Sequence, residues 1–265
     1  MKEKERVVFF LRDGLSAAEK ERMAAYGADM NKYLDSGNEA RIKKAYESRD
    51  PRLQMAVITP YAQYNGASSG IAHTYTLRWP YRGSDSAEPF DIRTDTNDKF
   101  YYLWRKFVPE GLEQTERDTY GLDIPLIRYA EVLLLKAEAL NEWGSTHESE
   151  AIRCVNEVRR RAGHVELNNV TYPATKVNGQ SDLRERIRNE YYWEIGGEDS
   201  MYFHELRWGT WKDKKFDNNR NGLMQMWGET TYTWYWLGDQ CWSWPIPAKE
   251  MEMNSNLEQN EGWIN

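Results

Sequence analysis

The stretch PLIRYAEVLLLKAEALNEWGSTHESEAIRCVNEVRRRAG, residues 125–163, predicts two helices joined by a tight turn. Gly144 stands where a left-handed cap would end the first helix. Ser145 and Glu148 have the spacing of a capping box, which favours a new helix directly afterwards. Gly163 is placed to end that second helix. Two helices of similar length around a short turn predict an antiparallel hairpin of the tetratricopeptide kind.

Apolar residues recur at helical spacing in both halves of this hairpin. Pro125 can open the first helix, because a first-turn residue needs no backbone donor. The residues expected on the wide apolar face of this helix are Tyr129, Val132, Leu133, Leu134, Leu135, Ala137 and Leu140. We therefore expect most of the first helix to be buried. The side chains expected to be almost fully buried are Leu133, Ala137, Leu140, Val155 and Val158.

The chain as a whole predicts a mainly α fold with long loops and a few short β-strands. Helices are expected over about 12–48, 125–142, 148–162 and 181–195, the last with Leu183, Ile187, Tyr191 and Glu194 on one face. Strands are expected over 53–59, 99–107 and 230–237. Residues 64–90, dense in Gly, Ser, Pro and aromatic residues, predict a long surface loop.

We expect one domain over residues 1–265. Its parts, in chain order, are a helical segment (12–48), a strand and aromatic-loop region (49–120), a helical core (121–210), and an aromatic strand with an extended tail (211–265). A chain of 265 residues is long enough to bury one large core.

Charge and motifs exclude several classes of function. The chain has 35 Lys and Arg against 42 Asp and Glu, a formal net charge of −7, which argues against a nucleic-acid partner. The basic residues of RRRAG and RERIRNE are interleaved with carboxylates, which indicates a solvated or salt-bridged helix face. No HExxH, GxSxG, Walker or GxGxxG pattern occurs, so we expect no catalytic residue, no metal site and no cofactor.

The two cysteines and the N-terminal residues bear on compartment. Cys154 and Cys241 lack metal-site spacing, and Cys154 is expected to be a buried free thiol in the second hairpin helix. No apolar run is long enough to span a bilayer. We find no signal-peptide core near the start and no lipid-attachment cysteine before Cys154.

Five blocks of the sequence resemble the SusD/RagB family of Bacteroidetes, in the order that the family has them. The hairpin, with RYAEVLLLKAEALNE and VNEVRRRAG, is similar to the C-terminal half of that family. The other blocks are ESRDPRLQMAVITP (47–60), NDKFYYLWRKFVPEG (97–111), LRERIRNEYYWEIGGEDSMYFHELRWG (183–209) and WSWPIPAKEMEMNSNLEQNEGW (242–263). The RDPR, RNER-type and PIP motifs lie within these blocks.

The resemblance implies a function as well as a fold. It implies the C-terminal domain of a cell-surface, outer-membrane lipoprotein that binds a glycan or another nutrient without catalysis. The ligand would pass to a SusC-like, TonB-dependent transporter. It also implies that the family's N-terminal half, a further partner, is absent from this chain. We therefore expect an uncovered apolar patch and self-association of the chain.

The aromatic loop is the candidate ligand site. Its candidate residues are Tyr64, Asn65, Tyr75, Trp79, Tyr81 and Arg82. Tyrosine and tryptophan rings stack on the C–H face of a sugar, while Asn and Arg donate to its hydroxyl groups. In the family, the segment between the RDPR block and the hairpin supplies part of a shallow aromatic platform. The alternative interpretation is that these rings anchor the loop to the core.

Two further interpretations remain open. A second aromatic cluster, Trp211, Trp227, Trp234 and Trp236, is interpreted as packing. The whole chain is alternatively a helical-repeat scaffold that binds only protein, without a ligand site of its own. The direction of the aromatic rings discriminates the two functions, since exposed rings favour a glycan binder and rings packed into the core favour the scaffold.

Overall fold

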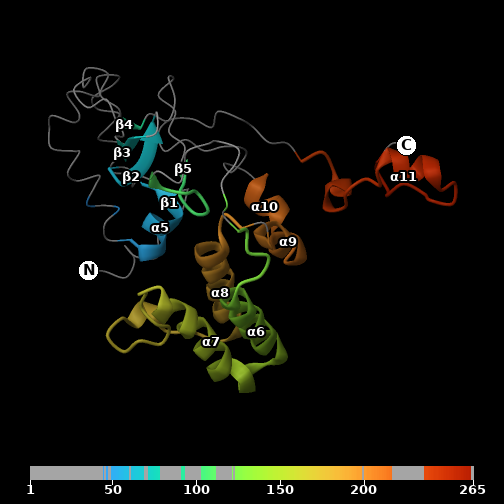
Figure 1. The fold of residues 1–265 in the computed structure, drawn as a ribbon. Coiled ribbons are helices and arrows are strands. Elements are labelled where there is room, and N and C mark those ends of the chain that lie inside the picture. The colour runs from blue at the N-terminus through green and yellow to red at the C-terminus, as the bar shows by residue number, and fades with distance from the viewer. Residues whose placement is uncertain are drawn as a thin grey trace, which may run out of the picture. The chain divides into compact units, whose positions relative to one another are not determined.

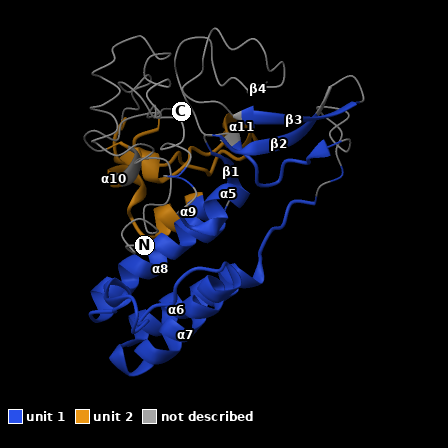
Figure 2. Cartoon of the chain, turned by 90° about the vertical axis from the view of Figure 1, so that its left-hand side faces the viewer, with its two compact units in different colours: residues 1–201 blue, residues 202–265 orange. Residues whose placement is uncertain are grey.

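The computed structural model describes residues 44, 46, 49–59, 61–68, 71–77, 91–92, 103–111, 121, 123–198, 200–216 and 236–263 (Figure 1). The chain divides into two compact units, residues 1–201 and 202–265 (Figure 2). Nearly all of the helical segment expected over 12–48 lies outside the described residues, as do 99–102 and 230–235. The expected single domain stays a prediction.

Three helices form the core of the first unit. They are α6 (Tyr129–Trp143), α7 (Glu148–Arg161) and α8 (Gln180–Ile195), and α6 packs against both of the others (Figure 1). All of the side chains predicted to be almost fully buried are buried: Leu133, Ala137, Leu140, Val155 and Val158. Leu183, Ile187, Tyr191 and Glu194 share the buried face of α8 as predicted. The mainly helical fold and its central hairpin are confirmed.

The first hairpin helix is shorter and less buried than predicted. It begins at Tyr129 rather than Pro125, because Arg128 has extended backbone with φ −113° and ψ 153°. Tyr129, Val132 and Leu135 are exposed, so the prediction that they widen the buried face is wrong. The described neighbours of α6 cover one side of it, and this leaves a narrower buried stripe of Ala130, Leu133, Leu134, Ala137 and Leu140.

The turn of the helical hairpin also differs from the prediction, both in its backbone conformation and in its capping. Gly144 has φ 135° and ψ 173°, which is not the left-handed helical cap that we predicted. A 3₁₀ turn, η3 (Ser145–His147), follows it, and no side chain caps the start of α7, so the capping box does not form.

Gly163 ends α7 as predicted. Its φ is +70°, its N–H donates to the Arg160 carbonyl over 3.1 Å, and the His164 N–H donates to the Arg159 carbonyl over 2.8 Å. This pair of bonds is a Schellman motif, in which the left-handed position favours glycine. The motif also turns the chain so that His164 enters the core.

A short helix replaces most of the strand predicted over 53–59. Helix α5 (Pro51–Ala56) begins because the Asp50 side chain accepts from the Arg52 N–H and Pro51 occupies the first turn. Only β1 (Val57–Ile58) is extended, and it pairs antiparallel with β5 (Leu103–Trp104). The local cap therefore overrides the β-prone side chains.

The segment predicted as a long loop contains a β-hairpin. Strand β2 (Gln63–Ser68) pairs antiparallel with β3 (Ile71–Leu77), and β3 pairs in parallel with β4 (Asp91–Ile92). In this register Tyr64 lies opposite Tyr75, and Asn65 lies opposite Thr74. Glycine and serine content led to the loop prediction, whereas alternating polar and aromatic residues in β3 favour a strand.

The second unit has short helices where an extended tail was expected. After α9 (Ser200–Arg207), which spans the unit boundary, come α10 (Trp211–Lys215), the 3₁₀ turn η6 (Asp239–Trp242) and α11 (Ala248–Met253). Another 3₁₀ turn, η4 (Pro173–Thr175), belongs to the first unit. Residues 236–237 are not in a strand. The prediction of a fully extended tail is wrong, because α11 lies within it.

Two expectations about cysteine and membrane spans can be set against the described residues. Cys154 is a buried free thiol, as predicted, and Cys241 is also free. Each helix in the described part of the chain is too short or too polar to cross a membrane.

Candidate functional site

The β2–β3 hairpin carries three of the six predicted site residues, and it divides them between two faces. Cross-strand partners share a face, and neighbours along a strand alternate between faces. Tyr64 and Tyr75 therefore lie on one face, and Asn65 lies on the other with Thr74. The structure therefore does not bring Tyr64 and Tyr75 to the same surface as Asn65.

Tyr64 anchors the hairpin. Its ring is buried, and its hydroxyl donates to the Pro109 carbonyl over 3.0 Å. On the same segment, Glu110 accepts from the Asn65 backbone N–H over 3.2 Å and from Arg105 Nε over 2.5 Å. These bonds attach the hairpin to residues 105–110, so the buried ring of Tyr64 offers no stacking surface.

Tyr75 is half-buried, and its ring covers Gly66. A Cβ atom at Gly66 would lie 2.7 Å from Tyr75 Cε2, so this close approach requires glycine. His73 packs edge-on against Tyr75, with ring centroids 6.3 Å apart. The Tyr75 ring is therefore held between Gly66 of β2 and the ring of His73, and part of its surface is open to solvent.

The Asn65 side chain faces solvent, and only part of the hydrogen-bonding capacity of its amide group is taken up within the protein. Its Oδ1 accepts from Thr74 Oγ1 over 3.1 Å, which fixes the orientation of the amide group. Within the described residues, its Nδ2 donates to no protein group, so it can serve a ligand hydroxyl. The remaining predicted site residues, Trp79, Tyr81 and Arg82, lie outside the described residues.

A buried network of ion pairs is the main feature that the sequence interpretation missed. Its cations are Arg52, Lys106, Arg128, Arg159 and Arg161, and its anions are Asp50, Glu190, Glu194 and Glu198. The network joins α5, α7 and α8 to two further segments. One is the turn that follows β5, which carries Lys106, and the other is the segment that leads into α6, which ends at Arg128. Basic residues predicted to form a solvated or salt-bridged face thus include buried members. Glu194 on the apolar face of a predicted helix was the available signal, since an isolated buried charge is costly.

Arg52 is the centre of this network. Its Nη2 donates to Asp50 Oδ2 over 2.7 Å, and its Nη1 donates to Glu190 Oε1 over 2.8 Å and to Glu194 Oε2 over 3.1 Å. Arg159 Nε donates to the second oxygen of Glu190 over 2.8 Å. The Glu190 carboxylate therefore lies between two guanidinium groups, and each of its oxygens accepts a charge-assisted hydrogen bond from one of them.

Arg128 closes the network at the start of α6. Its Nη1 donates to Glu194 Oε1 over 2.9 Å, and its Nε and Nη2 donate to Glu198 over distances from 2.6 to 3.1 Å. Lys106 Nζ donates to the Glu194 carbonyl over 2.9 Å and also pairs with Glu198. Residues 106 and 128, which flank an undescribed stretch, are thus both tied to the end of α8.

The network holds two of its carboxylates, those of Asp50 and Glu194, ionised. Burial raises the pKa of Glu194, but hydrogen bonding from Arg128 and the charges of Arg52 and Arg161 outweigh burial and leave that pKa lowered. The pKa of Asp50 is lowered in the same way, with Arg52 outweighing burial. Because these ionised carboxylates are engaged by arginine side chains, the cluster has the chemistry of a structural support.

His164 lies beside this network without joining it by a hydrogen bond at Nε2. That atom is 3.6 Å from Asp50 Oδ2 and donates to none of the described residues. Burial, followed by the charge of Arg159, lowers the pKa of His164 below its ordinary value of 6.5, against the opposing charges of Asp50 and Glu190. The imidazole is therefore neutral at neutral pH.

Aromatic rings pack together in the second unit. Trp211 and Trp236 meet edge-to-face with centroids 5.6 Å apart, and Trp242 lies 5.1 Å from Trp236 in a similar arrangement. Tyr202 and Phe216 also pack edge-on against Trp211. For Trp211 and Trp236 the packing interpretation is confirmed, whereas Trp227 and Trp234 lie outside the described residues.

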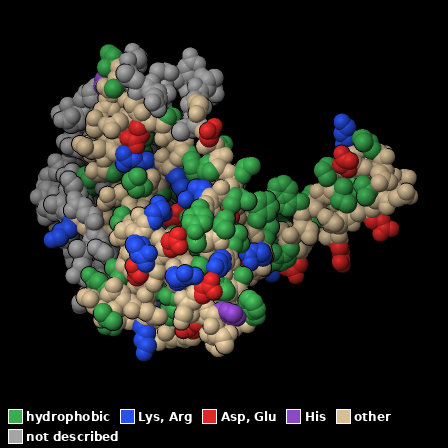
Figure 3. Space-filling model, turned by 60° about the horizontal axis from the view of Figure 1, so that its bottom comes forward, with side chains coloured by type: hydrophobic (Ala, Val, Ile, Leu, Met, Phe, Trp, Pro, Cys, Tyr) green, Lys and Arg blue, Asp and Glu red, His purple; other side chains and the backbone are tan. Residues whose placement is uncertain are grey.

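The surface charge is mixed. Figure 3 shows Lys and Arg side chains interspersed with Asp and Glu on the face that it presents. The described residues contain no group of three or more His, Cys, Asp and Glu side chains arranged to hold a metal ion.

Comparison with known proteins gives one consistent family. A family model described as the SusD family matches residues 13–263. A SusD-like protein of Formosa agariphila is 32% identical over 139 residues, 52% of this chain and 24% of the relative. The starch-binding protein SusD of Bacteroides thetaiotaomicron is 28% identical over 161 residues, 60% of this chain and 25% of the relative. The matched stretches thus cover about a quarter of the length of these curated relatives.

A solved structure agrees with these sequence matches. A SusD-like protein from Bacteroides fragilis NCTC 9343 aligns with a TM-score of 0.58 at 22% identity, covering 83% of this chain and 40% of that one. At this level of identity the likeness shows a shared fold.

Proposed function

The chain belongs to the SusD family, and we propose that it acts as a non-catalytic glycan-binding module at the cell surface. The observation that carries the proposal is the family match over residues 13–263. A relative named as a starch-binding protein supports a carbohydrate ligand. We extend the proposal to the outer membrane, where the protein would pass its ligand to a SusC-like, TonB-dependent transporter.

We place the ligand contacts on the open face of the β2–β3 hairpin and the residues that follow it. Asn65 presents its amide to solvent, oriented by Thr74, and can donate to a sugar hydroxyl. Trp79, Tyr81 and Arg82 follow β3 in the sequence and are proposed as the stacking rings and a further donor. Tyr64 and Tyr75 lie on the opposite face, and we assign them to support of the hairpin.

Affinity electrophoresis of the chain tests this proposal. The native gel would contain amylopectin, or one of a panel of other neutral and acidic polysaccharides. Retarded migration in at least one polysaccharide is expected, with no shortening of the polysaccharide after incubation. Unretarded migration in every gel would overturn glycan binding by this chain. Release of reducing ends would overturn the non-catalytic assignment.

The transporter step needs a separate measurement. We expect the protein to co-purify from outer membranes with a TonB-dependent transporter. Stable co-purification with a different protein, together with the absence of any polysaccharide binding, would favour the alternative function of a helical scaffold.

A further inference from the structure

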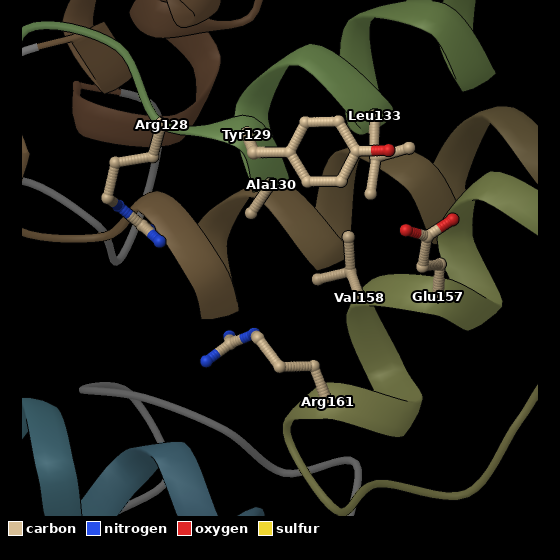
Figure 4. A pocket seen from close by; sticks show the side chains of 7 residues that line it. All are labelled: Arg128, Tyr129, Ala130, Leu133, Glu157, Val158 and Arg161. Atoms are coloured by element: carbon tan, nitrogen blue, oxygen red, sulfur yellow. The ribbon is translucent and has the colours of Figure 1, made fainter.

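A pocket of about 380 Å³ opens between the first turns of α6 and the last turns of α7, within the first unit (Figure 4). It lies on the helical hairpin and shares no lining residue with β2 or β3. Pockets that hold small molecules typically begin at about 300 Å³, so this volume suits one sugar unit.

The pocket combines an apolar floor with an exposed aromatic ring. Ala130, Leu133 and Val158 line it and are buried. Tyr129 lines it as well, and this residue is 68% exposed. In Figure 4 the ring of Tyr129 extends over the floor, with its hydroxyl directed to the side on which Glu157 lies. A flat ligand can therefore contact the ring and the floor together.

Groups of opposite charge stand at the two ends of the pocket. The Glu157 carboxylate lines the pocket, and it interacts with the neighbouring Arg160 through charge without a hydrogen bond or ion pair to a described residue, so it can accept. Arg161, on the other side, donates to Glu194 Oε2 over 2.5 Å through Nη2 and keeps its Nε and Nη1 hydrogens available among the described groups. Figure 4 shows the guanidinium group of Arg161 turned away from Glu157, toward Arg128.

Arg128 forms one wall of the pocket. Its Nε, Nη1 and Nη2 all donate to Glu194 or Glu198 already. Because these bonds fix the guanidinium group, one edge of the pocket is held in place by the buried network. Pre-organised walls reduce the entropy that is lost on binding.

We infer that this pocket is a second glycan subsite, which takes one neutral pyranose unit of the ligand. The inference rests on the proposed function of glycan binding. A pyranose has an apolar C–H face for Tyr129 and the floor, and hydroxyl groups that both donate to Glu157 and accept from Arg161. An acidic sugar fits less well, because the charge of Arg161 is already paired with Glu194, whereas no described cation pairs with Glu157 to offset a second carboxylate.

The test compares two exposed aromatic residues of the same helix. Tyr129→Ala removes the ring at the pocket, and Trp143→Ala removes a ring that is 75% exposed, stacks on His147 and lies outside the pocket. Both variants are expected to fold, because neither side chain belongs to the core. The ligand is a neutral polysaccharide that retards the wild-type chain in the gel. Affinity for it should fall about three- to tenfold for Tyr129→Ala and stay unchanged for Trp143→Ala. Glu157→Gln should also weaken binding, since it replaces an ionised acceptor.

The outcomes separate this inference from the proposed function. If the wild-type chain binds a neutral polysaccharide but Tyr129→Ala and Glu157→Gln bind as tightly as Trp143→Ala, the subsite is overturned and glycan binding stands. If the wild-type chain binds no polysaccharide, both fall. A preference for uronate-rich polysaccharides that is lost in Tyr129→Ala would overturn the neutral ligand. A change of sedimentation mass in Tyr129→Ala with unchanged affinity would mean that protein, and not sugar, occupies the pocket.

Discussion

Arg52 and Glu190 are 138 residues apart in the sequence, yet Arg52 Nη1 lies 2.8 Å from Glu190 Oε1 with both side chains buried. The pair joins α5 to the middle of α8. The Glu190 carboxylate is shared with Arg159 from α7, so one buried side chain links three helices.

Removing the charge of Glu190 should destabilise the fold strongly. Glu190→Gln leaves Arg52 and Arg159 buried with less compensation, and breaking one partner of a buried ion pair costs about 3–5 kcal/mol. Urea denaturation, followed by tryptophan fluorescence, measures the free energy of unfolding. Glu166→Gln is the control, because it breaks a solvent-exposed pair with Arg160, and it should leave that free energy unchanged. Equal effects of the two variants would contradict a stabilising network.

Substitutions at two adjacent leucines of α6 should differ sharply in their effect on the free energy of unfolding. Leu134 is 0% exposed and Leu135 is 40% exposed. Leu134→Ala should lower the free energy of unfolding by about 2–5 kcal/mol, because it removes buried surface and leaves a cavity. Leu135→Ala should cost less than half as much in the same denaturation experiment. If Leu135→Ala costs as much as Leu134→Ala, the face of α6 that carries Leu135 is covered in solution.

Acid should destabilise the protein in two stages. His164 has a folded pKa below 6.5, so the unfolded chain binds the extra proton first, and stability falls as the pH drops below about 6.5. Asp50 and Glu194 have lowered folded pKa values, so their contribution is present above the ordinary carboxyl values of 3.8 and 4.5 and is lost as the pH falls through the folded values.

Thermal melts between pH 8 and pH 3 check both stages. His164→Gln should remove the pH dependence of the melting temperature between about pH 6.5 and pH 5, whatever its effect at pH 8. The loss of stability below about pH 4.5 should remain in that variant. A wild-type melting temperature that rises from pH 7 to pH 5 would be the opposite of the expected sign.

The proposed hairpin site predicts a loss of affinity without a loss of stability. Asn65→Ala with Trp79→Ala should reduce polysaccharide affinity by one to two orders of magnitude, since a hydrogen bond and a stacking ring are both removed. Tyr64→Phe is the matched comparison on the other face. It removes the bond to the Pro109 carbonyl, and it should lower the free energy of unfolding by about 0.5–1.5 kcal/mol while affinity stays unchanged. The reverse pattern would place the ligand on the tyrosine face.

The residues before α6 predict self-association of the chain. Leu126 is 89% exposed, and Ile124 and Ile127 are exposed beside it in the sequence. Apolar surface of this kind favours contact between copies. Sedimentation velocity should show dimers or larger species at high concentration, and Leu126→Lys with Ile127→Lys should shift the chain to monomer. A monomeric wild-type chain at every concentration would refute this prediction.

The hairpin helices were predictable because their signals are local. Apolar spacing places Leu133, Ala137 and Val155 on faces that any packed helix would bury, and Gly163 ends its helix through a motif of neighbouring residues. The same local signals failed at α5, where the Asp50 cap and Pro51 outweigh β-prone side chains. They failed again at residues 63–77, where composition concealed the alternation of a strand pair.

The sequence alone determined the helical hairpin, the mainly α class and the family, since each follows from periodicity or from ordered motifs along the chain. Only the tertiary structure decided which charges are buried and which face of the β-hairpin holds Asn65. It alone brought Tyr129, Glu157 and Arg161 around one pocket. Periodicity is fixed by neighbours within a few residues, whereas an ion pair or a pocket depends on distant segments meeting, and its free energy appears only once they are packed.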